Sequence, residues 1–555
     1  MLQEIRKYLE KYAGKEDFLV EYPKNNNYGD ISSNIALVLS KKEARSAMDC
    51  AGELKEKIEK NIPEYLDKVE IAEPGFLNFY FNEKYYKDEL EKILIQKDKY
   101  ATSDVGIGKT MIIDYSSPNI AKRFGIGHLR STVIGQALYN LYKHIGYKVI
   151  GDNHLGDWGT QFGTLLYQVN KKGLKETDLS IEKLEELYIE FNEEAKNDEK
   201  LWDEARSWFK KLEEGDVEVK KIWKAMVDLS LAEFERVYEI LGIHIDKAYG
   251  ESFYEDYMPQ VMKLMREKGF VKKSEGAEIV EFKDMPPAML TKSDGATTYF
   301  TRDLATIHFR IGSWNPDLFI YEVGNEQTLH FRQVFEAARM LGWDKEYIHI
   351  GHGLYRWEHG KMSTREGNAI KLDEVLNKAI EKAKEIIEKS ETSRGLSDKE
   401  MESVAKDVGI GAVKYFDLTH HPKSDIIFDW NKIFMLEGNS APYLQYTVAR
   451  INSLIGKTQE KEPEIEKISL NKDSIETMRL LSRFEGIVIN AARNYSPNLV
   501  ANYLFEVAQK YNYYYNEHKI IGSEEEDLGI LLSKAVKIIL SSGLYILGIN
   551  TPEKM

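Results

Sequence analysis

The 555-residue chain has little cysteine, no apolar run of membrane length and no excess of positive charge. Its single cysteine, Cys50, excludes an intrachain disulfide framework and a zinc cluster built from cysteines. The N-terminal segment lacks the long apolar stretch of a signal peptide, and the apolar run from Val536 to Ile549 is short and interrupted by Ser and Gly. The formal net charge of −15 argues against a protein that coats nucleic acid with a whole basic face, although one basic groove would be compatible with it. We expect a soluble, cytoplasmic protein that does not contact a membrane.

A strand, a polar turn and a helix follow one another near residue 120. The apolar residues Met111 to Ile113 predict a strand, Ser116 to Asn119 a turn, and the residues after Gly125 and Gly127 an amphipathic helix that begins near His128. The helix start presents free N–H groups and a positive dipole end, which suit a phosphate or a carboxylate. The spacing fits neither the dinucleotide fingerprint nor the Walker loop. The segment therefore predicts a nucleotide site of another kind.

A second ligand-binding segment follows the next predicted strand, Lys148 to Gly151. Residues 152–163 form a polar, glycine-dense stretch at the carboxyl end of that strand, where open α/β sheets hold their ligands. We interpret it as a wall of the active site, and the alternative is an ordinary turn. Residues 170 to about 265 then show amphipathic helical spacing with many charges, which indicates a helical insertion with solvated faces.

The second half of the α/β core is predicted from strands near Ala277 to Phe282 and Leu318 to Val323, with a helix between them. If Tyr299 opens that helix, Asp303 lies four residues further on and shares its face. A carboxylate beside a phenol can receive a planar cation, because a guanidinium offers paired N–H donors and can stack on the ring. The alternative is that Asp303 pairs with Arg302 or Arg310 on the helix surface.

Residues 359–368 form a basic loop that contains Lys361, Met362 and Ser363 between two glycines. Such a loop can close over a triphosphate and neutralise charge as pyrophosphate leaves. The histidines near this point are not expected to bind zinc, and we predict no protein-held metal site. Beyond about Leu372 the pattern is helical, with breaks at 420–430 and 457–470.

These segments together resemble arginyl-tRNA synthetases. Residues 116–122 with 125–132 are similar to the HIGH signature of class I aminoacyl-tRNA synthetases in its arginyl form, residues 152–163 match a hallmark of that family, and residues 361–365 resemble the KMSKS loop. Two N-terminal segments, 28–36 and 72–79, resemble the family's N-terminal domain, and 438–450 with 547–555 its anticodon-binding domain.

The resemblance implies a Rossmann-like α/β catalytic core with a helical insertion, a small N-terminal α+β domain and an all-α C-terminal anticodon-binding domain. We expect the N-terminal domain at 1–105, the catalytic domain at 106–375 with its insertion at about 170–265, and the helical domain at 376–555. It also implies the ligation of L-arginine to its tRNA through arginyl-adenylate, with ATP and Mg²⁺ and with transfer to the terminal 2′-hydroxyl. Two alternatives are a non-catalytic tRNA-binding relative and a small-molecule nucleotidyltransferase of the same superfamily. We expect a monomer.

The resemblance assigns residues to three ligands. The residues implied for ATP are Lys122, Gly125, Gly127, His128, Lys361, Met362 and Ser363, with His128, Lys361 and Ser363 as the catalytic ones. The residues implied for arginine are Asp114, Ser117, Asn119, Tyr299, Asp303 and Gln327. The residues implied for tRNA are Asn78, Phe81, Tyr446, Tyr515 and Met555. Packing of Phe81 in a core, a strand-end cap at Asn78 and a capping turn at Asn119 are the alternatives at those positions.

One position departs from the family pattern. Gly125 stands where the signature usually has its first histidine, and Arg123 where a proline is common. A donor that would face the phosphates is missing. We predict either a compensating contact from Lys122 or Arg123, or a slower activation step.

Overall fold

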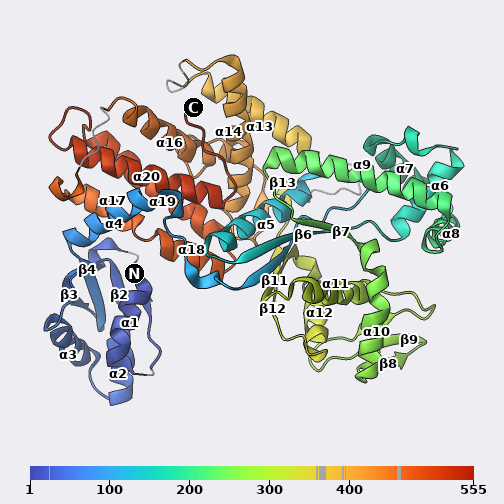
Figure 1. Ribbon diagram of the computed structural model, residues 1–555, viewed down its shortest axis with the longest axis horizontal. Helices are drawn as coiled ribbons and strands as arrows, with labels where there is room; N and C mark the ends of the chain where they lie inside the picture. Colours follow the sequence, from blue (N-terminus) through green and yellow to red (C-terminus); the bar gives the residue numbers. More distant parts are fainter. Residues whose placement is uncertain are drawn as a thin grey trace.

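The computed structural model describes residues 1–14, 16–23, 25–357, 360–361, 371–390, 393, 395–458 and 464–555. A parallel sheet lies near the centre, with a small N-terminal domain on one side and a helical half above it (Figure 1). A group of helices inserted in the core extends away from the sheet on the opposite side from the N-terminal domain (Figure 1). The α/β core, the N-terminal α+β domain and the all-α C-terminal part agree with the predicted fold class.

The N-terminal domain is an antiparallel sheet covered by helices. Its strand order is β1-β2-β4-β3. Alternate apolar residues of β4, including Leu77 and Phe79, are buried beneath the helices. The elements are α1 Leu2–Ala13, β1 Val20–Glu21, β2 Ile31–Ser33, α2 Ile35–Glu43, α3 Ala47–Glu59, β3 Leu66–Ala72, β4 Phe76–Phe81 and α4 Glu83–Gln96.

The central sheet has five parallel strands in the order β12-β11-β5-β6-β7. Its strands are β5 Thr110–Asp114, β6 Lys148–Leu155, β7 Lys247–Gly250, β11 Leu318–Gly324 and β12 Glu346–His352. The chain order reverses between β5 and β11, and open α/β sheets bind their ligands beyond the carboxyl ends of strands at such a point. The turn after β5 lies there.

Both faces of this sheet are covered, as a parallel sheet requires. Because side chains alternate along a strand, Met111 and Ile113 of β5 pack in the core that contains α5, Ile126–His144, while Ile112 joins the opposite core. That second core holds α11, Tyr299–Trp314, and α12, Thr328–Met340. The helix predicted to begin near His128 is α5, and it begins two residues earlier, at Ile126.

The insertion is shorter than predicted. It comprises α6 Thr160–Lys171, α7 Ile181–Ala195, α8 Leu201–Glu213 and α9 Val217–Leu241. Within the predicted range 170–265, β7 belongs to the main sheet, and after it come a 3-10 segment, Glu251–Tyr257, and α10, Met258–Glu267. The predicted strand near 277–282 is correct but lies in a separate antiparallel sheet of β8 Val271–Ser274, β9 Ala277–Val280 and β10 Ala288–Thr291.

The last third is helical, as predicted. Its helices are α13 Leu372–Ile387, α14 Asp398–Leu418, α15 Trp430–Ile433, α16 Ala441–Ile455, α17 Lys472–Leu481, α18 Phe484–Arg493, α19 Asn498–Glu517 and α20 Glu526–Ile546. Three short strands, β13 Tyr355–Trp357, β14 Gly360–Lys361 and β15 Ile426–Ile427, connect it to the core. By length and composition α20 is apolar enough to cross a membrane, but 72% of its most apolar window is buried inside the protein. It packs as a core helix against α16, α17 and α19.

Candidate active site

The turn between β5 and α5 is held in an uncommon backbone conformation. Ser116, Ser117 and Ala121 have φ values of 72°, 44° and 63°, which residues with a side chain rarely adopt. Three side chains from other elements accept their N–H groups: Ser131 Oγ that of Ser116 (2.9 Å), Asn153 Oδ1 that of Ser117 (3.0 Å), and Ser230 Oγ that of Ala121 (2.8 Å). The surrounding structure therefore fixes this turn, as is typical of a functional site.

His128 lies in the first turn of α5, where free backbone N–H groups point beyond the helix. Its Nδ1 accepts a hydrogen bond from the N–H of Gly125 at 3.2 Å, so the ring proton of the neutral imidazole is on Nε2. Burial, and next the charge of Lys122, lower the pKa of His128 to about 4. At neutral pH the residue is thus an uncharged donor at a helix N-terminus, suited to a phosphate oxygen. The exposed Gly127 leaves the same helix end open.

The missing histidine at position 125 leaves open space. Gly125 has φ −94° and ψ 165°, which any residue adopts, and a Cβ there would meet only His128 Nδ1, at 4.0 Å. Arg123 does not fill this space, because its guanidinium pairs with Glu182 at 2.5 Å and Glu185 at 3.3 Å on α7. Lys122 has no such carboxylate among the described residues, and its Nζ lies 4.7 Å from the centre of the Tyr188 ring. Of the two predicted compensating residues, Lys122 is the one that remains available.

The carboxylate at the end of β5 belongs to a buried charge cluster. Arg310, which is fully buried, lies between Asp114 Oδ2 (2.6 Å) and Asp152 Oδ2 (2.9 Å), and Ser117 donates its hydroxyl to Asp114 Oδ1 at 2.9 Å. Two of the six predicted arginine ligands, Asp114 and Ser117, thus have protein partners. This cluster also corrects the prediction for Asp152 and Asn153, which are buried residues of β6 rather than part of a loop.

The two residues of the predicted guanidinium receptor, Tyr299 and Asp303, lie in the first two turns of α11. Tyr299 is the first residue of that helix, as predicted, and the residue is 65% exposed. Asp303 pairs with neither Arg302 nor Arg310; its Oδ2 lies 2.5 Å from Nε2 of His330 on α12. Burial opposes its charge, but the hydrogen bond and charge of His330 hold the pKa of Asp303 below its ordinary value. The carboxylate therefore remains charged and suited to a cation.

Glu251 is a further acidic residue of this cluster that the sequence patterns did not single out. It follows β7, pairs with Arg302 at 3.1 Å, and lies within electrostatic range of Asp303 and Tyr299. Burial raises the pKa of Glu251 to about 7, although Arg302 opposes the shift. A carboxyl group with a strongly shifted pKa beside a candidate pocket is a sign of function. The only sequence signal was a charged residue directly after a short strand.

Other predicted residues lie at the same edge of the sheet. Asn119 is exposed and forms a β-bridge with Gly156, which brings the turn after β5 against the turn after β6. Gln327 is exposed at the end of a 3-10 turn, Asn325–Gln327, that follows β11. These two polar side chains are free to meet a ligand, and their roles stay predictions.

The chain beyond the second signature loop returns to the first signature. The side chain of Lys361, and the whole of Met362 and Ser363, lie outside the described residues. On the far side of that loop, Lys371 forms a β-bridge with Gly125, and the N–H of Leu372 donates to the carbonyl of Phe124 at 3.2 Å. The loop therefore ends directly at the start of α5.

The residues implied for tRNA fall into two groups. The side chains of Asn78, Phe81 and Met555 are buried; Phe81 packs 4.2 Å from the ring of Tyr85, which supports the packing alternative for it. Tyr446 on α16 and Tyr515 on α19 are partly exposed. The guanidinium carbon of Arg450 lies 4.9 Å from the centre of the Tyr446 ring and 5.2 Å from that of Tyr515. Aromatic rings in such a position can stack on unpaired bases, so this pair fits its predicted role better.

Comparison with known proteins agrees with this architecture. Three family models match: "Arginyl tRNA synthetase N terminal domain" over residues 1–81, "tRNA synthetases class I (R), catalytic domain" over 89–430, and "DALR anticodon binding domain" over 444–555. The arginine–tRNA ligase of Halothermothrix orenii is 42% identical over 91% of this chain and 90% of its own length. That of Fusobacterium nucleatum is 39% identical over 96% and 94%.

Solved structures share the fold. The arginyl-tRNA synthetase of Plasmodium falciparum superposes with a TM-score of 0.87 at 24% identity, over 100% of this chain and 99% of its own. That of Thermus thermophilus gives 0.84 at 22% identity, with the same coverage. With its N-terminal, catalytic and anticodon-binding regions all matched, the chain belongs to the arginyl-tRNA synthetase family of class I.

Proposed function

We propose that this protein ligates L-arginine to its tRNA in two steps. In the first, a carboxylate oxygen of arginine attacks the α-phosphorus of ATP and the bond to pyrophosphate breaks. In the second, the 2′-hydroxyl of the terminal adenosine attacks the arginyl carbonyl, AMP leaves, and the hydroxyl proton is released. One observation carries the proposal: an uncharged His128 at a helix start and an acidic, aromatic cluster flank the same carboxyl edge of the sheet.

The residues act mainly by positioning and by stabilising charge. Nε2 of His128 and the free N–H groups at the start of α5 would bind ATP phosphate oxygens, with Lys122 in the place of the missing histidine. Lys361 and Ser363 would hold the departing pyrophosphate. Asp303, with Tyr299 and Glu251, would receive the guanidinium in bidentate geometry.

The proposal also covers the metal ion, the cellular location, the oligomeric state, the domain limits and the tRNA contacts. Magnesium would arrive on the ATP phosphates, since in the described ranges no group of three or more His, Cys, Asp or Glu side chains is arranged for a metal ion. We place the enzyme in the cytoplasm as a monomer without a membrane partner. The domain limits 1–105, 106–375 and 376–555, and the tRNA contacts of Tyr446 and Tyr515, belong to this proposal too.

The test is arginine-dependent exchange of pyrophosphate into ATP, with and without tRNA for arginine, and with lysine and canavanine as competitors. We expect exchange with arginine, competition by canavanine, and little effect of lysine, which lacks the planar fork. Asp303→Asn should raise the KM for arginine about 100-fold, because it removes one charge-assisted pairing. Asp294→Asn, in the exposed loop before α11, is the matched control. Absence of exchange under every condition would refute the proposal.

A further inference from the structure

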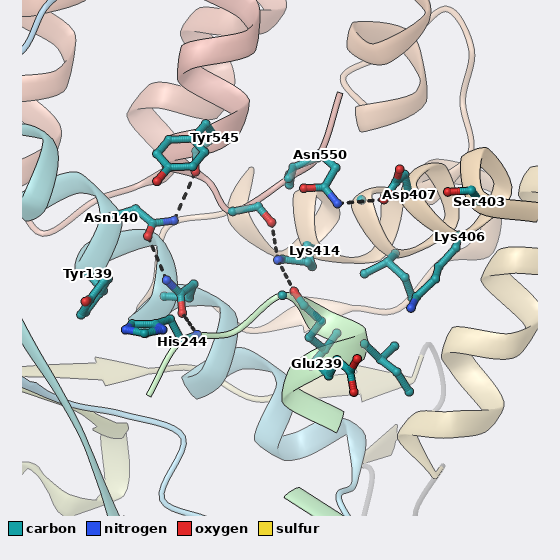
Figure 2. A pocket seen from close by; sticks show the side chains of 18 of the residues that line it. Tyr139, Asn140, Glu239, His244, Ser403, Lys406, Asp407, Lys414, Tyr545 and Asn550 are labelled. Atoms are coloured by element: carbon teal, nitrogen blue, oxygen red, sulfur yellow. Dashed lines mark hydrogen bonds between the residues drawn. The ribbon is translucent and has the colours of Figure 1, made fainter. Parts of the chain in front are cut away.

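Lys414 of α14 is a buried basic residue between the ends of two long helices. The side chain is 1% exposed, and its Nζ donates hydrogen bonds to the carbonyls of Leu241, at 2.6 Å, and Gly548 (Figure 2). Leu241 is the last residue of α9, and Gly548 lies two residues beyond the end of α20. In the part of the chain that the structure describes, no carboxylate lies within ion-pair distance of this ammonium group.

The carbonyl groups at two helix ends accept the hydrogen bonds of Lys414 that a carboxylate would otherwise accept. The last carbonyls of a helix have no partner within it, and its C-terminal end carries about −0.5 of an elementary charge. The ammonium group of Lys414 satisfies one such carbonyl of α9 and another just past α20. Burial opposes the charge and lowers the pKa of Lys414 to about 7. Despite the unfavourable burial of its amino group, Lys414 joins the insertion helix α9 to the helical half of the protein.

The junction around Lys414 is hollow. A cavity of about 530 Å³ lies beside it, lined among others by Asn140 of α5, His244 after α9, Lys406 of α14 and Tyr545 of α20 (Figure 2). The side chain of Leu241 packs in the main core, but on the side of the cavity the end of α9 has no close-packed neighbour. The two hydrogen bonds from Lys414 join the last turn of α9 to α14 and to the end of α20, beside two other contacts: Arg236 of α9 pairs with Asp373 of α13 at 2.8 Å, and the N–H of His244 donates to Gln136 of α5 at 2.6 Å.

Side chains of α9 also contact the turn between β5 and α5, which we call the catalytic turn. Ser230 accepts the N–H of Ala121 at 2.8 Å, and the hydroxyl of Tyr238 lies 2.8 Å from Ser116 Oγ. Tyr238 and Phe234 also pack against the ring of Phe124, which in turn lies 5.2 Å from that of His128. Tyr238 is one helical turn before Leu241, so a shift at the end of α9 moves its contacts with the turn.

We propose that Lys414 is a positioning residue for adenylate formation: by fixing the end of α9 against α14 and α20, it sets the turn that orients His128. This inference rests on the proposed function. Lys414 touches no substrate and acts through α9.

The experiment compares Lys414→Met with Lys414→Arg and with Lys406→Met, which removes the same charge from an exposed position two turns earlier on α14. Arginine-dependent pyrophosphate exchange is measured with varied ATP and arginine, and circular dichroism reports folding at the assay temperature. We expect about a tenfold fall in kcat for Lys414→Met, with each KM within about threefold of wild type. Lys414→Arg, whose guanidinium can donate to both carbonyls, should recover most of the rate, and Lys406→Met should lose none.

Three results would overturn the inference: folded Lys414→Met with a kcat within twofold of wild type, an equal loss in Lys406→Met, or a loss that Lys414→Arg does not reduce. If Lys414→Met does not fold, Lys414→Gln, an uncharged donor, is judged by the same kcat criterion. Inactive wild-type protein would refute the proposed function instead. Active wild type with an equally active Lys414 variant refutes only the role of Lys414.

Discussion

Lys122 should carry the phosphate contact that position 125 no longer supplies. Replacing Lys122 with Met removes the ammonium group but keeps a chain of similar length over Tyr188. A hydrogen bond to a charged group contributes about 1.5–3 kcal/mol, which corresponds to a loss of about 10- to 150-fold in the rate of pyrophosphate exchange. The change should appear in kcat and in the KM for ATP, with the KM for arginine unaffected.

Arg123→Met is the matched control, since it removes a neighbouring cation that the structure directs elsewhere. Its pairs with Glu182 and Glu185 are partly solvent-accessible, so their loss should cost about 1 kcal/mol and change exchange less than about fivefold. A rescue strengthens the test. Because a side chain fits at Gly125, adding Gly125→His to Lys122→Met should restore part of the lost rate.

Two outcomes would refute this reasoning. Lys122→Met with an exchange rate within twofold of wild type would show that no compensating contact exists, and an equal loss in Arg123→Met would show that any cation in this turn serves. In the wild-type background we expect Gly125→His to stay within about threefold, since the donor position is already filled. A large loss there would instead mean that the site has been rebuilt around glycine.

Further predictions concern charge, pH and the helical half. The contribution of His128 to the pH profile of exchange should lie toward pH 4, because its folded pKa of about 4 lies below its unfolded value near 6.5. The stability that His128 contributes is present above about pH 6.5 and lost as the pH falls through its folded pKa. A kcat step near pH 6.5 that disappears in His128→Asn would contradict this. Arg310→Met should lower the free energy of unfolding by about 3–5 kcal/mol in urea denaturation, since it leaves two buried carboxylates unpaired, and Asp152→Asn added to it should recover part of the loss; a stable single variant would speak against the cluster. Tyr515→Ala should raise the KM for tRNA about tenfold in aminoacylation without changing the KM for arginine, and equal shifts in both would argue against base stacking.

The sequence predicts best what is decided locally. The strand at β5, the helix start before His128 and the position of Tyr299 at the opening of α11 follow from apolar spacing and from turn residues within a few positions. The fold class follows from these elements and from the family resemblance. None of this required knowledge of which distant segments meet.

The errors arise where polar residues find partners far away in the chain. Asp152 and Asn153 look like loop residues, yet they continue β6, because Arg310 and Tyr238 provide partners for their side chains in the interior. The alternative for Asp303, a pair with Arg302 or Arg310, is wrong for the same reason, because its partner His330 comes from the next helix rather than from its own. A single sequence contains no local signal for such pairs.

The catalytic turn shows why the signature residues alone do not make this site. Its backbone occupies the left-handed region at three positions, and each of these costs about 1–3 kcal/mol unless neighbouring groups enforce it. The enforcing groups come from α5, β6 and the insertion helix α9, which lie far apart in the sequence. The insertion therefore supports the active site directly, because without Ser230 and Tyr238 the turn would lose two of the contacts that hold it. The position of His128 thus depends on how α9 is anchored at its far end, in the helical half of the protein.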